Sequence, residues 1–221
     1  KTIVVLDHHR QSSDNIDNAL LSYIEPYASS ACEMVSEVLQ YIVDDIKIPN
    51  LEASSLYAGI MIDTNNFMNK TGVRTFEAAA FLRRSGADIT LVRKMFRDDM
   101  ESYRAKAQII SSAEVYHNKY AIARGENLTI ESPTIIGAQA ANELLDINEV
   151  KASFVLTTYN GRIYVSARSI DEVNVQIIME RLGGGGHMNA SGAQFDHTDM
   201  DEAVADLKQV IDDVIEGGEI E

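Results

Sequence analysis

The chain has 221 residues, of which 45% are hydrophobic, so it can bury the core of one large domain or two small ones. Its formal net charge of −15 argues against general binding to nucleic acid or anionic lipid, but leaves room for a small nucleotide in a locally positive pocket. The one cysteine, Cys32, lies in an apolar helical pattern, so we expect a reduced, buried thiol. The sequence has neither a signal peptide nor an apolar run of the roughly 18 residues that cross a membrane, and we expect a cytosolic or cytosol-facing chain.

The first half of the chain has the pattern of an α/β domain. Residues 2–6 form a short apolar, β-branched run, which is typical of a strand buried on both faces of a parallel sheet. The run starts without a turn or a cap, which favours a chain cut inside a domain. Four helices are then expected. The first begins at the capping box of Ser30 and Glu33, the second covers 51–61, the third covers 75–85, and the fourth begins at Asp88. A long polar helix over 97–112 follows them.

The second half predicts a smaller, mixed α+β domain. One hairpin is expected over 114–124, and another where Asn160-Gly161 separates two apolar runs, because this dipeptide favours a type I′ turn. Residues 192–195 suggest a strand. Three helices complete the pattern. The first covers 133–145, with Pro133 at its favoured first position, and the second covers 174–183, capped by Asn174. The third covers 200–215 and has apolar residues along one face.

An acidic residue and two histidines, Asp7-His8-His9, directly follow the first expected strand. Ligand sites in open α/β folds gather at the carboxyl ends of parallel strands. One imidazole there can bind a divalent metal while its neighbour faces a substrate. A bare histidine pair is more often an exposed loop, and that alternative stays open for the motif alone.

A second acidic residue, Asp63, ends the nearly all-apolar stretch 59–62. A carboxylate beside a core needs a partner or a metal. The alternative is that Asp63 caps a helix or a turn, which is the commoner role of aspartate before Thr64-Asn65-Asn66.

Four glycines at 183–186 precede His187 and favour a phosphate-binding loop. One glycine can close a helix, but four in a row let backbone N–H groups approach a phosphate without interference from side chains. Arg168 follows an apolar strand and could clamp the same phosphate. The alternatives are a flexible hinge for the glycines and a surface salt bridge for Arg168. The hinge is less favoured because Arg168 and Asn174 lie just upstream.

Together these motifs resemble the DHH phosphoesterase superfamily with its DHH-associated C-terminal domain. The shared marks are the segments 7–9, 59–64 and 183–187, in that order and at wide spacing. Four further segments, 25–30, 72–77, 166–169 and 174–176, are similar to those of the membrane-anchored cyclic-di-AMP phosphodiesterases of Gram-positive bacteria. The resemblance covers essentially the whole chain.

The resemblance implies an α/β fold with three parts. These are a partial DHH domain over 1–98 whose N-terminal half is missing, a connector helix over 99–113, and a DHH-associated nucleotide-binding domain over 114–217. His8 and Asp63 would ligate one metal of a two-metal site, His9 would face the substrate, and Asp7 would orient His8. The substrate-binding residues would be Arg168, Asn174, Gly184, Gly185, Gly186 and His187.

The expected reaction is hydrolysis of cyclic di-AMP to linear 5′-pApA by a water activated between two Mn²⁺ ions. The family's other metal ligands precede the Asp-His-His motif, and this chain begins six residues before it. We therefore expect a fragment that is catalytically inactive alone. The full-length protein would lie at the cytoplasmic side of the membrane, anchored by segments upstream of this chain. It could form a homodimer. No long nucleic acid is expected as a partner.

Other readings stay open beside this one. An oligoribonuclease or pAp phosphatase of the same superfamily is the nearest, although residues 74–76 and 172–174 favour the cyclic-dinucleotide group. A family inorganic pyrophosphatase is less favoured, because Ser169 rather than a lysine follows Arg168. The third reading, from another class, is a nucleotide-binding module without catalysis. Bound manganese in the purified chain would discriminate best.

Overall fold

The computed structural model describes residues 2–9, 16, 18–42, 45–170, 173–196 and 198–220. Glu172, which belongs to one of the segments that favoured the cyclic-dinucleotide group, lies outside the described residues. The chain divides into two compact units, Lys1–Arg97 and Asp98–Glu221. In the described part of the chain, no helix has both the length and the apolar character needed to cross a membrane.

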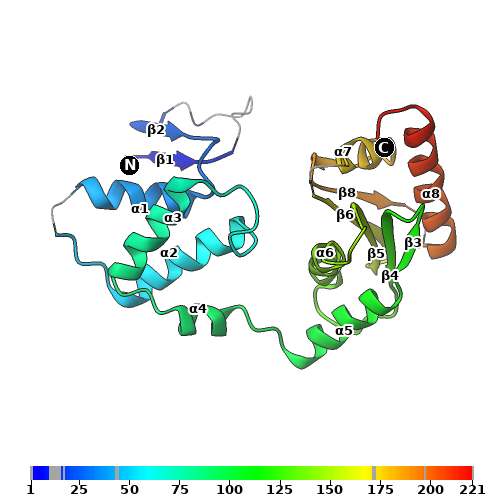
Figure 1. Ribbon diagram of the computed structural model, residues 1–221, viewed down its shortest axis with the longest axis horizontal. Coiled ribbons are helices and arrows are strands. Elements are labelled where there is room, and N and C mark those ends of the chain that lie inside the picture. Colours follow the sequence, from blue (N-terminus) through cyan, green and yellow to red (C-terminus); the bar gives the residue numbers. More distant parts are fainter. Residues whose placement is uncertain are drawn as a thin grey trace. The chain divides into compact units, whose positions relative to one another are not determined.

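The first unit carries a small parallel sheet and a group of short helices (Figure 1). Its apolar core lies mainly between the second and third helices, where Ile60 and Leu82 are fully buried. The elements described in this unit are β1 (Val4–Asp7), β2 (Leu21–Ile24), α1 (Ala31–Ile42), α2 (Asn50–Asp63), α3 (Val73–Arg84) and α4 (Ile89–Met95).

The first strand is parallel, as the sequence predicted. β1 pairs with β2 in parallel, with Val4 opposite Leu21 and Asp7 opposite Ile24. Burial on both faces was wrong, because Val4 is 53% exposed and Leu21 is 54% exposed. Only two strands form this sheet among the described residues, so the apolar side chains keep open surface.

The predicted caps fix where the helices begin. Ser30 Oγ accepts a hydrogen bond from Glu33 N at 3.0 Å, which confirms the start of α1. The Glu33 carboxylate is buried and accepts from Ser29 N at 3.3 Å. Asp88 caps α4 by accepting from Thr90 N at 2.8 Å.

The expected helix over 97–112 begins later than its pattern suggested. It is α5, Met100–Ser111, and the carboxylate of Asp99 caps it by accepting from the backbone of Glu101 and Ser102. A cap residue stands outside the helix it starts, so Arg97 cannot belong to α5. Ala105 and Ile109 of α5 are buried in the core of the second unit.

The second unit is built on a six-stranded sheet in the order β3-β4-β5-β6-β8-β7. β4 and β5 run parallel, and the other neighbours are antiparallel. Helices cover both faces of this sheet (Figure 1). The elements after α5 are β3 (Glu114–Tyr116), β4 (Tyr120–Gly125), α6 (Pro133–Leu144), β5 (Ala152–Tyr159), β6 (Arg162–Ser169), α7 (Val175–Arg181), β7 (Gly185–His187), β8 (Ala190–Phe195) and α8 (Met200–Glu216).

The two faces of the sheet follow from the alternation of side chains along each strand. On β4, Tyr120 and Ile122 join the core beneath α7 and α8. The intervening Ala121 and Ala123 join a separate core with α5 and α6. Small residues on the second face let α6 lie close to the sheet.

Both predicted hairpins are confirmed, and both turns use the left-handed region. The turn between β3 and β4 has φ of 50° at His117 and 58° at Asn118, and the turn between β5 and β6 has 49° at Asn160 and 71° at Gly161. Positive φ at two successive residues is what a type I′ turn requires. A third hairpin, β7–β8, was not predicted, because its first strand consists of glycines and one histidine.

Candidate functional site

The Asp-His-His motif lies at the carboxyl end of the parallel sheet in the first unit. Asp7 is the last residue of β1, and its carbonyl accepts a hydrogen bond from Glu25 N at 2.8 Å. The strand pairing therefore continues to the point where the motif leaves the sheet. His8 and His9 follow in the loop, with ring centroids 4.4 Å apart.

The carboxylate of Asp7 contacts His9, whereas the sequence-based expectation paired it with His8. Asp7 Oδ1 lies 2.7 Å from His9 Nδ1 and accepts from His9 N at 3.0 Å. These hydrogen bonds, the backbone one first, hold the pKa of Asp7 below its usual value. An ionised Asp7 fixes the orientation of the His9 ring, so that Nε2 faces away from the carboxylate.

His8 meets the second predicted ligand, Asp63. His8 Nε2 lies 3.7 Å from Asp63 Oδ2, and the two side chains are 16% and 40% exposed. Asp63 is the last residue of α2, where the negative end of the helix dipole disfavours a carboxylate. A cation beside Asp63 would offset that cost. In the described ranges, no group of three or more histidine, cysteine, aspartate or glutamate side chains is arranged so that it could hold a metal ion.

The backbone after Asp63 adopts an unusual conformation that fixes the end of α2. Asn65, Asn66 and Phe67 have φ of 45°, 58° and 65°, a region costly for side chains such as phenylalanine. Thr64, buried and next to Asp63, holds this turn: its Oγ1 donates to the carbonyl of Ile60 and accepts from Phe67 N at 3.0 Å.

Cys32 lies against Gly59 of α2 and is half-buried rather than fully buried. A Cβ at Gly59 would lie 2.2 Å from Cys32 Sγ, so a larger residue at that place on α2 would force the thiol to move. Burial raises the pKa of the Cys32 thiol, and the charge of Asp63 adds to the effect. The thiol is therefore poorly suited to act as a nucleophile.

Arg168, in the second unit, is a half-buried cation. Its Nη1 donates to the carbonyl of Ala167 at 2.8 Å, and no carboxylate pairs with it among the residues that the structure describes. Burial lowers the pKa of its guanidinium. A charge kept partly out of water without an opposite charge is what an anion-binding site needs.

Arg168 and His187 stand on either side of one small residue. Ala190 of β8 pairs with Arg168 of β6 and with His187 of β7, so the three side chains leave the same face of the sheet. In the next row on that face, Gly192 pairs with Gly185. We call Gly185, Ala190 and Gly192 the open strip, since their small size leaves the sheet surface bare beside Arg168 and His187.

The last three of the four glycines have different roles. A Cβ on Gly184 would lie 2.1 Å from the carbonyl oxygen of Gly192, and one on Gly186, where φ is 144°, would lie 2.7 Å from that of Ala190. Both glycines are thus required by the close approach of the β7–β8 backbone. Gly185 has open space where a side chain would be.

Asn174, also predicted to bind substrate, uses its side-chain oxygen in the fold. It accepts from Gln176 N at 3.1 Å and thereby caps α7. Next to it, Val175 N donates to the carbonyl of Met188 at 3.0 Å. The start of α7 is therefore tied to the turn between β7 and β8, next to His187.

Comparison with known proteins agrees with this arrangement. Residues 1–60 match the model of the DHH family, N-terminal domain, and residues 120–216 match that of the DHHA1 domain. The chain therefore carries a DHH domain followed by a DHHA1 domain. A crystal structure of an exopolyphosphatase-related protein from Bacteroides fragilis shares the fold of this DHH/DHHA1 chain, with a TM-score of 0.82 at 24% identity over 96% of this chain and 64% of that one.

Two curated relatives are similar over nearly the whole chain. It is 44% identical over 217 residues to the cyclic-di-AMP phosphodiesterase GdpP of Geobacillus thermodenitrificans, and 42% identical over 211 residues to the cyclic-di-AMP phosphodiesterase PdeA of Listeria monocytogenes. The matches cover 98% and 95% of this chain, but 33% and 32% of the relatives. This DHH/DHHA1 chain therefore spans about one third of their length.

Proposed function

We propose that the protein carrying this chain is a manganese-dependent phosphodiesterase that hydrolyses cyclic di-AMP to linear 5′-pApA. The observation that carries the proposal is Arg168, a half-buried cation with no carboxylate partner among the described residues, which stands beside an open strip of sheet. The choice of cyclic di-AMP is supported by the named activity of the two curated relatives.

The second unit would hold the nucleotide. Arg168 would bind a phosphate from one side of the open strip, and His187 would face it from the other. The open space at Gly185 would let the sugar-phosphate chain lie close to the backbone. Such two-sided binding fixes the phosphate for in-line attack. Asn174 would act indirectly, by holding the start of α7 against the β7–β8 turn.

His8 and Asp63 would hold one Mn²⁺ ion. Their nitrogen and oxygen donors fit that ion, and Asp63 lies at the helix end where a cation is favoured. When bound, divalent ions of this kind polarise phosphoryl oxygens and lower the pKa of a coordinated water. His9, held at Nδ1 by Asp7, would present Nε2 to the leaving oxygen.

The described residues offer two of the ligands that a pair of ions needs. We therefore propose that these 221 residues alone bind an adenine nucleotide but do not hydrolyse it. We also propose the division made from the sequence: a DHH part over 1–98, a connector over 99–113, and a nucleotide-binding domain over 114–217. The resemblance to membrane-anchored enzymes supports a place at the cytoplasmic side of the membrane for the full-length protein.

A product assay tests the proposal. The full-length protein would be incubated with cyclic di-AMP and Mn²⁺, and the products would be separated by chromatography, beside parallel reactions with pAp and short RNA. Accumulation of 5′-pApA at the highest kcat/KM supports the proposal. Much faster turnover of pAp or RNA would assign the protein to the oligoribonuclease group instead.

A further inference from the structure

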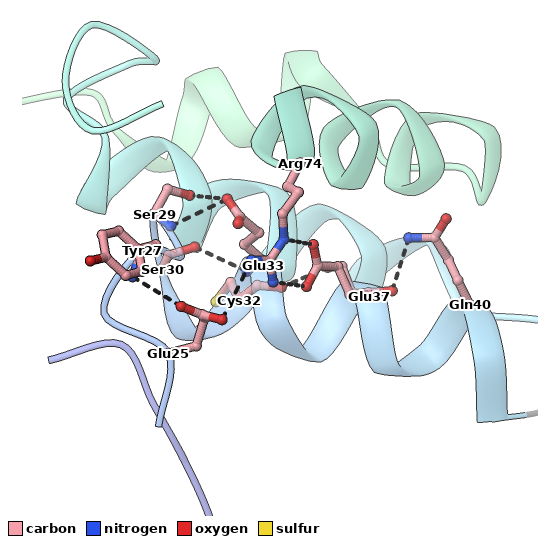
Figure 2. A network of polar contacts seen from close by, with 10 residues as sticks. Glu25, Tyr27, Ser29, Ser30, Cys32, Glu33, Glu37, Gln40 and Arg74 are labelled. Carbon is pink, nitrogen blue, oxygen red and sulfur yellow. Dashed lines mark hydrogen bonds and ion pairs between the residues drawn. The ribbon is translucent and has the colours of Figure 1, made fainter. Parts of the chain in front are cut away.

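Arg74 contacts two separate acidic residues, Glu37 and Glu25 (Figure 2). Its Nε and Nη2 each donate to one carboxylate oxygen of Glu37 on α1, both at 2.7 Å. Its Nη1 lies 3.7 Å from Oε2 of Glu25, the residue after β2. Two parallel hydrogen bonds of this kind fix the orientation of the guanidinium relative to the carboxylate as well as their separation, because the guanidinium is planar.

Glu25 links this contact to the motif. Its backbone N donates to the carbonyl of Asp7 at 2.8 Å, and Asp7 immediately precedes His8. Its side chain also accepts from Tyr27 N at 3.3 Å, which holds the carboxylate at the start of its own loop. One residue therefore stands between the guanidinium of Arg74 and the backbone that carries His8.

Arg74 is also tied to Asp63. The loop after Asp63 leads directly into α3, whose first turn contains Arg74. Asn69 N donates to the carbonyl of Thr64 at 2.8 Å, so the loop folds back on the end of α2. The rings of Phe67 in this loop and Phe76 on α3 stack with centroids 5.7 Å apart. These contacts give the loop little freedom to move relative to α3.

We propose that Arg74 is a positioning residue that sets the separation of His8 and Asp63. Through Glu25 it contacts the end of β2 that is bonded to Asp7, and it stands on α3, the helix that follows the loop after Asp63. We propose that this link keeps the side chains of His8 and Asp63 3.7 Å apart. This inference rests on the proposed function only in taking His8 and Asp63 as metal ligands. Arg74 itself touches neither ligand in the contacts described, and acts through Glu25 and α3.

The test compares lysine substitutions at two places on α3 in the full-length protein. Arg74→Lys keeps the positive charge but removes the fork. Arg84→Lys is the matched control, because Arg84 stands in the last turn of the same helix, at the opposite end from Arg74. Binding of Mn²⁺ alone would be measured by titration with electron paramagnetic resonance. Thermal unfolding of the metal-free proteins would be recorded beside it.

We expect Arg74→Lys to weaken Mn²⁺ binding by up to roughly tenfold, the lower end of what loss of a partner that touches a metal ligand costs, because Arg74 acts only through Glu25 and α3. The metal-free unfolding temperature should stay near that of the wild type, and Arg84→Lys should bind Mn²⁺ normally. Glu25→Gln should weaken Mn²⁺ binding in the same direction, since it removes the charge that joins Arg74 to the motif.

Turnover gives an independent readout. Excess Mn²⁺ should restore kcat in Arg74→Lys, with little change in KM for cyclic di-AMP. Wild-type Mn²⁺ affinity in Arg74→Lys would overturn the inference, and so would a loss of affinity that only follows a loss of folded protein. If the wild type binds Mn²⁺ but prefers another substrate, the proposed function fails while the role of Arg74 stands.

Discussion

Arg168 on β6 and His187 on β7 pair with the same residue, Ala190 of the strand between them. They are 19 positions apart in the sequence, yet their side chains leave one face of the sheet in a single row. The small residue between them keeps the space above the sheet open. This row is the feature of the second unit that best explains how it would hold a phosphate.

The first prediction concerns Arg168 itself. Arg168→Met should weaken cyclic-di-AMP binding by roughly 1.5–3 kcal/mol, the usual range for a hydrogen bond to a charged group. The free energy of unfolding should not fall, because the substitution removes a half-buried charge that lacks a carboxylate partner among the described residues. Calorimetric titration under chelator, with a thermal melt, measures both quantities.

Arg162→Met is the control for this experiment. Arg162 is exposed on the same strand and, six residues before Arg168, points to the same face. It should change neither affinity nor stability noticeably. Equal affinities for the Arg168 and Arg162 variants would show that Arg168 is a structural charge.

The second prediction concerns Asp63. Asp63→Asn in the full-length protein should abolish turnover, because it removes a proposed metal ligand. The metal-free protein should become more stable by roughly 0.3–1 kcal/mol, since a negative charge is removed from the end of a helix. Asp146→Asn, a matched exposed aspartate just beyond α6, should leave turnover unchanged. Normal turnover with normal metal content in the Asp63 variant would contradict the assigned role.

The third prediction separates two neighbouring glycines. Gly184→Ala should destabilise the second unit by about 1–3 kcal/mol, because its methyl group would overlap the backbone at Gly192. Gly185→Ala has room and should fold normally, but its methyl group would stand on the open strip and weaken nucleotide binding. Unfolding curves and binding isotherms of the two variants distinguish these effects. Normal binding by folded Gly185→Ala would remove the open strip from the proposed site.

The fourth prediction concerns stability against pH. Asp212 on α8 accepts from Tyr116 at 2.8 Å and contacts His117 Nε2 at 2.7 Å, and these bonds, the histidine first, hold the pKa of Asp212 below its usual 3.8. A depressed carboxyl pKa adds stability above the unfolded value and loses it as the pH falls through the folded value.

Asp212→Asn should therefore be less stable than the wild type at pH 7. The difference should begin to shrink as the pH falls below about 3.8, where the carboxyl of the unfolded chain takes up its proton, and should vanish once the pH is below the lower pKa of the folded carboxyl. Asp213→Asn, one position along α8, serves as the control. Denaturant unfolding at several pH values measures the difference, and a gap that stays constant down to pH 2 would be inconsistent with the contact.

Local patterns in the sequence predicted most of the elements. Ser30, Asp88 and Asn174 marked helix starts, and Asn160-Gly161 marked a hairpin, because each acts through its own backbone or that of its near neighbours. The parallel pairing of β4 with β5 was not predicted, since it joins residues about 30 positions apart and leaves no local mark.

The candidate site was predictable in its residue types but not in its contacts. His8 and Asp63 were expected together, and their side chains do face each other. The fork of Arg74 on Glu37 was missed, although the segment containing Arg74 had been singled out, because it spans 37 positions. The glycine run suggested a phosphate loop, whereas close backbone packing alone accounts for Gly184 and Gly186.

The most direct test of the central claim is the product formed from cyclic di-AMP by the full-length protein with Mn²⁺, followed over time by chromatography. We expect 5′-pApA to accumulate, its formation to stop when the metal is chelated, and none to form with Asp63→Asn. Turnover that continues undiminished in chelator, or an Asp63→Asn variant as active as the wild type, would contradict it.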